Sequence, residues 1–128
     1  MAVRRLYEGF IPGRHTIEAY GAGGFRFGEI SHRGSILALP SGIHLWPVET
    51  LAAMSEASLA PLFAEADAID LVLLGTGEDM AAVPEAVRWL FRDAHMGLEP
   101  MATAAAARTY NILFGEGRRV AAALIAVP

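Results

Sequence analysis

Apolar and polar residues follow two different periods along this chain, and the second half shows the clearer pattern. Apolar runs at residues 69–74, where Asp70 is the single polar residue, and at residues 120–127 have the length of strands and no regular polar alternation, which predicts strands buried on both faces. A third strand is predicted at residues 98–102. Helical spacing of apolar residues fills the intervals, at residues 84–94 and from Thr103 onward. This series is typical of right-handed crossover units, so we expect parallel strands with helices on the faces of the sheet.

The residue pattern in the first third of the chain predicts short strands joined by tight turns. Runs of β-branched and aromatic residues indicate strands at residues 15–20, 25–30, 35–39 and 43–46. Clusters of Gly, Ser and Pro indicate turns at residues 21–24, 31–34 and 40–42. We expect these strands to form a hairpin or a meander.

A helix is predicted between the two halves of the chain. Ser58 is expected to cap it, Pro61 is tolerated in its first turn, and it should end near Ala66. The whole pattern predicts an α/β fold: a single three-layer domain with a central mixed, largely parallel sheet, helices on its faces and an N-terminal β-hairpin or meander. A chain of 128 residues has the usual length of one domain. We divide it into an N-terminal segment at residues 1–14 and the α/β domain at residues 15–128.

The beginning of the chain carries Arg4 and Arg5 but no apolar run long enough for a signal peptide or a membrane-spanning helix. We therefore expect no transmembrane segment. The expected location is the bacterial cytoplasm, and a mitochondrial location is expected only for a eukaryotic member.

Composition excludes several kinds of chemistry. The formal net charge is −4, which argues against nucleic acid as a partner because phosphate binding needs clustered positive charge. Cysteine is absent, so disulfides, iron–sulfur ligation and thiol nucleophiles are excluded. All ten basic residues are Arg, which removes a Lys Schiff base and a P-loop lysine. The histidines have none of the short spacings of metal motifs, so we expect no metal and no other cofactor.

The segment at residues 103–124 joins a helix to a buried strand and carries polar residues that neither element needs. Thr103 is expected to cap the helix with its hydroxyl, and the alanines that follow favour the helical state. One face of this helix carries an apolar stripe that includes Tyr110, whereas Arg108 and Asn111 share another face. One face should therefore pack, and the other should present Arg108 and Asn111.

Three pieces of the chain resemble one known family. They are Arg108-Thr109-Tyr110-Asn111 with Glu116-Gly117-Arg118-Arg119-Val120-Ala121-Ala122-Ala123-Leu124, then Leu73-Leu74-Gly75-Thr76-Gly77, and the Pro40-Ser41-Gly42 turn ahead of Trp46. Together they are similar to the family of the mitochondrial NADH:ubiquinone oxidoreductase (complex I) assembly factor 3 and its uncharacterised bacterial and archaeal relatives. The resemblance implies a compact α/β domain that acts through protein contacts in the mitochondrial members, with a respiratory-complex subunit or assembly protein as partner. It implies no catalytic mechanism.

The ends of the predicted strands indicate where a site would lie, because ligands of parallel sheets usually bind beyond the carboxyl ends of the strands. If the strands at residues 69–74 and 98–102 are neighbours, the glycine loop at residues 75–77 lies beside the helix start at Thr103. Free N–H groups would then be directed at one point. The candidate ligand- or partner-binding residues are Gly75, Thr76, Gly77, Thr103, Arg108, Tyr110 and Asn111.

These candidates also have structural interpretations. The glycines permit a tight turn with close packing, and Thr103 can serve as a helix cap alone. The loop lacks the third glycine of the dinucleotide fingerprint, and Glu78 and Asp79 would repel a phosphate. Solvation explains an exposed Arg108 and Asn111 as well as a functional contact does.

Two functions remain open. The first is a non-enzymatic protein-binding domain of the assembly-factor type, and an apolar content of 54% favours a surface for a partner or a homo-oligomer. The second is a small anionic ligand or an enzymatic reaction in the crevice of residues 75–77, Thr103, Arg108 and Asn111. No serine-hydrolase elbow is present, no catalytic residue is assigned, and we favour the first function. The position of Arg108 should distinguish the two functions. A closed pocket shared with the glycine loop would favour the ligand, and an apolar surface would favour the protein partner.

Overall fold

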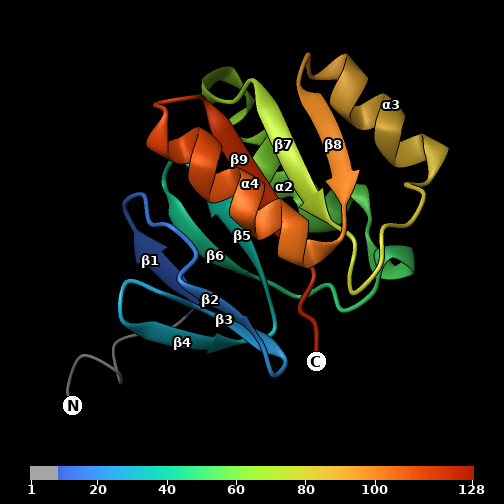
Figure 1. Cartoon of the computed structure of the whole chain (residues 1–128). Coiled ribbons are helices and arrows are strands. Elements are labelled where there is room, and N and C mark those ends of the chain that lie inside the picture. Colours follow the sequence, from blue (N-terminus) through green and yellow to red (C-terminus); the bar gives the residue numbers. More distant parts are fainter. Residues whose placement is uncertain (1–8) are drawn as a thin grey trace.

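A computed structural model describes residues 9–128, which contain a six-stranded sheet and a three-stranded sheet (Figure 1). The larger sheet has the order β1-β6-β5-β9-β7-β8. Its strands are β1 (Phe10–Pro12), β5 (Ser35–Leu39), β6 (Gly42–Trp46), β7 (Leu71–Gly75), β8 (Gly97–Met101) and β9 (Val120–Leu124). The smaller sheet contains β2 (Ala19–Gly21), β3 (Gly24–Phe27) and β4 (Ile30–Arg33). The helices are α2 (Glu56–Phe63), α3 (Glu85–Asp93) and α4 (Thr103–Gly115), with 3-10 turns η1 (Leu51–Ala53) and η2 (Ala66–Ala68).

The six-stranded sheet is mixed, and fewer of its strands are parallel than we predicted. Strands β8, β7 and β9 are parallel neighbours, as the crossover pattern indicated. The pairs β9 with β5, β5 with β6 and β6 with β1 are antiparallel. The prediction of a largely parallel sheet is therefore wrong in this respect. The β5–β6 hairpin is part of the central sheet rather than a separate hairpin. Every residue of β5 is buried, and β9 is its neighbour on the side opposite β6.

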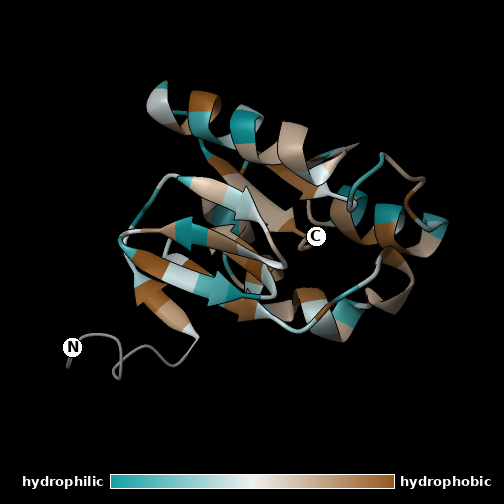
Figure 2. Cartoon of the chain, turned by 60° about the horizontal axis from the view of Figure 1, so that its bottom comes forward, coloured by the Kyte–Doolittle hydropathy of each residue, from teal (hydrophilic) through white to brown (hydrophobic). Residues whose placement is uncertain are grey.

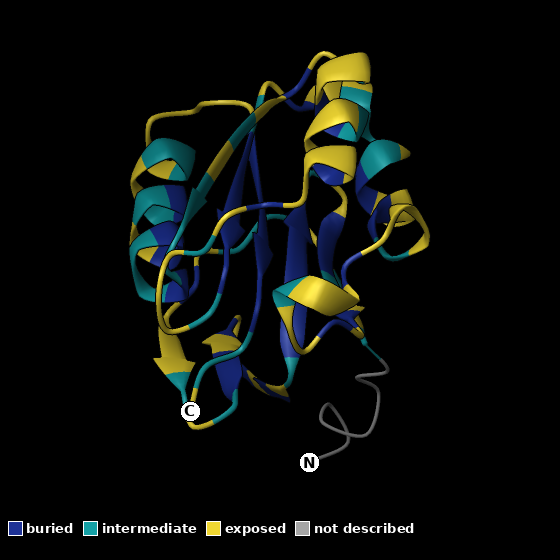
Figure 3. Cartoon of the chain, turned by 90° about the vertical axis from the view of Figure 1, so that its right-hand side faces the viewer, coloured by how far each residue is buried: buried dark blue, intermediate teal, exposed yellow. Residues whose placement is uncertain are grey.

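Helices cover both faces of the six-stranded sheet and produce three layers. Helices α2 and α3 pack through Leu62 and Phe91 against the face that carries Leu74 of β7. Helix α4 packs through Tyr110 against the opposite face, which carries Leu73. Figure 3 shows the buried strands between α4 on one side and α2 with α3 on the other. Neighbouring residues of a strand point to opposite faces, so β7 contributes to both cores and is a central strand, as predicted.

The three-stranded sheet covers the same face of the larger sheet as α4. Phe25, Phe27 and Ile30 belong to the core that also contains Leu73 and Tyr110. Figure 2 shows hydrophobic and hydrophilic residues along these three strands. One buried and one exposed face are the usual arrangement of an antiparallel sheet at a protein surface.

The hairpin of β3 and β4 differs from the prediction. The strand predicted at residues 25–30 is interrupted at Gly28 and Glu29, whose φ angles are 50° and 67°. Two consecutive positive φ angles are typical of the two-residue turn that joins hairpin strands. Residues 31–34, which we predicted as a turn, therefore supply most of β4.

The N-terminal boundary of the domain stays a prediction. Strand β1 lies in the segment that we separated from the domain, and it pairs with β6. Residues 1–8, including Arg4 and Arg5, lie outside the described residues.

Helix α2 begins earlier than predicted. Its N-cap is Ser55, whose hydroxyl accepts a hydrogen bond from the Ser58 N–H at 3.2 Å. The Ser58 hydroxyl accepts in turn from the Ser55 N–H at 2.9 Å, so the two serines form a capping box. Ser58 is thus the second member of the box rather than the cap. The two later helices, α3 and α4, agree with the predicted positions to within about one residue.

Candidate functional site

The glycine loop and the start of α4 lie side by side, as the predicted strand order required. The Thr103 main-chain N–H donates to the Gly77 carbonyl at 2.8 Å. The Thr103 hydroxyl accepts from the Gly77 N–H at 3.0 Å and donates to the Ile125 carbonyl at 2.7 Å. These groups, which we expected to face a ligand, are hydrogen-bonded within the protein.

The role of Thr103 differs from the predicted helix cap. Ala102 is the N-cap of α4, and no side chain accepts a hydrogen bond there. The fully buried hydroxyl of Thr103 instead joins the loop after β7 to the segment after β9. A Cβ at Gly75 would lie 2.8 Å from this hydroxyl oxygen, so the close approach requires glycine.

Thr76 determines the shape of the loop that follows β7. Its hydroxyl donates to the Asp79 carbonyl at 2.7 Å and accepts from the Ala81 N–H at 3.1 Å. Its main-chain N–H donates to the Met101 carbonyl at 2.9 Å, which extends the pairing of β7 with β8. The polar groups of Thr76 thus close the loop.

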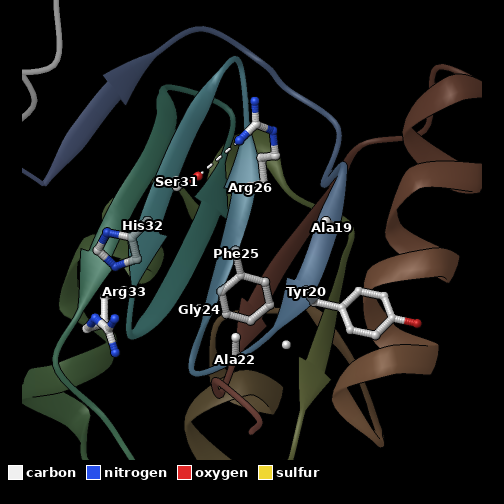
Figure 4. A pocket seen from close by; sticks show the side chains of 10 residues that line it. Ala19, Tyr20, Ala22, Gly24, Phe25, Arg26, Ser31, His32 and Arg33 are labelled. Atoms are coloured by element: carbon white, nitrogen blue, oxygen red, sulfur yellow. Dashed lines mark hydrogen bonds between the residues drawn. The ribbon is translucent and has the colours of Figure 1, made fainter.

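Arg108 and Asn111 face the three-stranded sheet rather than the glycine loop. The exposed Arg108 donates from Nη1 to the Tyr20 hydroxyl at 2.7 Å. The Asn111 side chain makes two hydrogen bonds to the main chain of Ile17, each 2.8 Å long. Figure 4 shows the Tyr20 side chain directed toward α4. The predicted site is therefore divided into a loop cluster and two contacts of α4, one with Tyr20 of β2 and one with Ile17 in the segment before β2.

Tyr110 belongs to the core. Its side chain is 1% exposed, and its ring stacks on Phe114 with centroids 5.9 Å apart. Burial raises the pKa of the Tyr110 hydroxyl, and the charge of Arg14 opposes this rise. A contact between Tyr110 and a partner would require α4 to leave the sheet.

Ser41, His44 and Glu65 form a polar cluster that our sequence analysis did not find. The Ser41 hydroxyl donates to the Glu65 carboxylate at 2.5 Å and lies 3.0 Å from His44 Nε2. Glu65 also accepts from the Ser41 N–H at 2.9 Å. Burial lowers the pKa of His44, and Glu65 opposes this shift. Because the carboxylate binds the serine rather than the imidazole, the cluster ties the β5–β6 turn to the segment after α2 and is not a charge-relay triad.

A hollow of about 440 Å³ on the three-stranded sheet also escaped the sequence analysis (Figure 4). Arg26 and Arg33 contribute its charged groups, and Ser31 lies across from Arg26 on the neighbouring strand. The alternation of apolar and polar residues through residues 25–33 was the available signal. The predicted turn at residues 31–34 interrupts this alternation, so the two arginines are not assigned to one face of a hairpin.

His32 alternates with these residues and points to the inner side of the same sheet. Its side chain is 7% exposed, and Nε2 lies 3.2 Å from the Ser35 carbonyl. Burial lowers the pKa of His32, and the hydrogen bond to Ser35 opposes this shift.

Two features of the described residues concern metals and membranes. Residues 9–128 contain no group of three or more His, Asp or Glu side chains that could hold a metal ion. The longest helix in this range, α4, has 13 residues, and none is long and apolar enough to span a membrane.

These features define a class of α/β domain in which an antiparallel hairpin, β5–β6, extends a parallel β8-β7-β9 unit. The chain belongs to the protein family of unknown function DUF498/DUF598, whose model matches residues 17–125. An uncharacterized relative from Rhodobacter capsulatus is 39% identical over 122 residues, which are 95% of this chain and 90% of that protein. The human NADH dehydrogenase (ubiquinone) 1 alpha subcomplex assembly factor 3 is 29% identical over 112 residues, or 88% of this chain and 61% of the human protein. The predicted family resemblance is thus confirmed.

Solved structures share the fold. The crystal structure of an outer membrane protein from Bartonella henselae has a TM-score of 0.88 and 42% identity, over 91% of this chain and 98% of that chain. The NMR structure of a protein from Rhodopseudomonas palustris has a TM-score of 0.83 and 45% identity, over 100% of this chain and 94% of that chain.

Proposed function

We propose that this chain is a non-enzymatic protein-binding domain that acts in the manner of an assembly factor. The relationship to human NADH dehydrogenase assembly factor 3 supports this function, because the similarity extends over 88% of the chain. The partner would be a subunit or an assembly protein of a respiratory NADH dehydrogenase, and the interaction would take place in the bacterial cytoplasm.

The outward face of α4 is the surface that supports a protein contact. Ile112 is 61% exposed, and Arg108 lies four residues earlier on the same face and is exposed too. The cores of protein interfaces are more apolar than the rest of the surface, and Arg is enriched among the residues that dominate the binding energy. The exposure of Ile112 is the observation that carries the proposal.

The position of Arg108 also favours the partner over a small ligand. Its guanidinium contacts Tyr20 on the surface, and the N–H of Gly77 and the hydroxyl of Thr103 are bonded to each other. An anion in the glycine crevice would have to compete with these internal hydrogen bonds, and Glu78 and Asp79 would repel it. The ligand role of the crevice stays a prediction.

A deletion strain of the source organism tests the proposal. Loss of the chain should reduce the amount of fully assembled NADH dehydrogenase on native gels, and the wild-type gene should restore it. Ile112→Asp and Arg108→Ala should restore it poorly, although both proteins should fold because both residues are exposed. Trp89→Ala on α3 is a matched control, since Trp89 is 49% exposed but lies in the opposite layer.

Two results would contradict the proposal. One is normal assembly of the complex in the deletion strain. The other is a melting shift of the purified protein with sulfate, phosphate or a nucleotide that is lost in Arg108→Ala, because this result would favour the small anionic ligand.

A further inference from the structure

The outer face of the three-stranded sheet carries two arginines at different ends of the hollow. Arg26 pairs with Ser31 across β3 and β4, and Arg33 follows two residues after Ser31. Residues two apart on a strand share a face and lie about 7 Å from each other. All three side chains are exposed, whereas His32 between them is buried. Figure 4 shows Arg26 beside Ser31, with Arg33 at the other end of the hollow.

The β2 side of the hollow is lined by small residues. They are Ala19, Gly21 and Ala22, from β2 and the turn that follows. Gly24 of β3 cannot take a side chain, because a Cβ there would overlap the carbonyl oxygen of His32. Tyr20 lies at the border next to α4, where its hydroxyl accepts from Arg108. Beside the two arginines, the hollow is therefore lined by residues with small side chains or none.

The carboxylates near this sheet leave the guanidinium groups of Arg26 and Arg33 available to bind a partner's carboxylates. Arg26 donates to the Ser31 hydroxyl at 3.1 Å and lies 3.7 Å from the Glu18 carboxylate, with both side chains of the ion pair about half exposed. An exposed pair of this kind is weak and is readily exchanged. Within residues 9–128, no carboxylate forms an ion pair with Arg33. Glu29 lies in the β3–β4 turn, at the end of the hairpin away from Arg33.

We propose that this hollow docks an extended acidic segment of a protein partner, with carboxylates at alternate positions pairing with Arg26 and Arg33. Alternate residues of an extended segment lie about 7 Å apart, like Ser31 and Arg33, so two carboxylates match the two ends of the hollow. Arginine pairs bidentately with carboxylates, and Arg clusters are a common means of recognising acidic motifs. The inference rests on the proposed protein-binding function, for which it names a second contact surface.

Titration with synthetic peptides, followed by NMR of the backbone amides, tests the inference. The probe is a blocked peptide with glutamates at two alternate positions between glycines and serines, and its control has glutamines there. The glutamate peptide should shift amides of β2, β3 and β4 and should bind more weakly as salt increases. Arg26→Gln and Arg33→Gln should each weaken binding by about twofold to fivefold, the range for one exposed ion pair. Arg88→Gln, an exposed change on α3, is the matched control and should leave binding unchanged.

Several outcomes would overturn the inference. They are equal binding of the glutamine peptide, amide shifts outside the three-stranded sheet, displacement of the peptide by an equal concentration of inorganic phosphate, and tighter binding of a single-stranded oligonucleotide. Complementation of the deletion strain shows whether only the acidic-segment inference fails or the protein-binding function fails as well. If Ile112→Asp impairs complex assembly while Arg33→Gln supports it and the peptide does not bind, the acidic segment is excluded and the protein-binding function stands.

Discussion

The side-chain carboxamide of Asn111 pairs with both main-chain polar groups of Ile17, through two hydrogen bonds of 2.8 Å. A carboxamide offers the same donor and acceptor as a peptide group, so Asn111 acts as a neighbouring strand for the residues that lead into β2. The bonds join positions 94 residues apart. They explain why asparagine, a mediocre helix former, stands in an alanine-rich helix.

Asn111→Asp and Asn111→Ala should destabilise the protein. Aspartate loses the donor and places a carboxylate oxygen against the Ile17 carbonyl, and alanine loses both partners. We expect the free energy of unfolding to fall by about 1–3 kcal/mol in each variant, which is the usual effect of an unpaired buried polar group. Urea denaturation measures this change, and hydrogen exchange at the Ile17 amide should become faster. Unchanged exchange at Ile17 would show that another group replaces Asn111.

Thr103→Val should destabilise the junction of the glycine loop, α4 and the C-terminal segment. Valine has nearly the shape of threonine but no hydroxyl, so the Gly77 N–H and the Ile125 carbonyl would both lose a partner. We expect a loss of about 1–3 kcal/mol for each unpaired group, measured by denaturant unfolding. Thr103→Ser keeps the hydroxyl and should lose clearly less. Equal losses in the two variants would mean that the methyl group rather than the hydroxyl matters.

Leu73→Ala tests the central position of β7. Leu73 is 1% exposed, and β7 lies between β8 and β9 in the sheet. Truncation should cost about 2–5 kcal/mol in free energy of unfolding because it leaves a cavity in a buried layer. Leu45→Ala, at a side chain that is 50% exposed, is the control and should cost much less. A loss below about 1 kcal/mol at Leu73 would contradict the observed packing.

Stability should fall as the pH is lowered through 6.5, the ordinary pKa of histidine. Burial lowers the pKa of His32 in the folded state, and the pKa of His44 is lowered in the same direction. The unfolded chain therefore binds protons first as the pH falls below 6.5, which favours unfolding until the folded pKa values are reached. Urea denaturation at about pH 7.5 and about pH 5.5 measures the loss. His32→Gln should show a smaller loss than the wild type, and an equal loss would assign the effect to other groups.

Arg108→Ala should leave the stability nearly unchanged. The variant loses the hydrogen bond to the Tyr20 hydroxyl, but both side chains are exposed and water can replace the partner. We expect a change below about 1 kcal/mol in thermal or urea unfolding, and Tyr20→Phe should behave alike. A loss above about 2 kcal/mol would assign Arg108 a structural role and would remove it as a clean probe of partner binding.

The sequence by itself determined the elements whose signal is local. The apolar runs of β7 and β9 and the helical spacing of α3 and α4 predicted strands and helices that the structure contains. The handedness and order of crossover units then placed the glycine loop beside Thr103, because parallel neighbours end at the same edge of a sheet. Family membership followed from motifs that are contiguous in the chain.

The tertiary structure alone decided how distant segments pair. The apolar residues of β5 indicate a strand buried on both faces, but nothing local identifies β9 as its neighbour or makes their pairing antiparallel. The partners of Arg108, Asn111 and Thr103 lie 22 to 94 residues away and are mostly main-chain groups, which have no sequence signature. Whether a polar side chain faces a ligand or another segment depends on which main-chain groups the fold leaves unpaired, and these are determined only when the sheets and helices pack together.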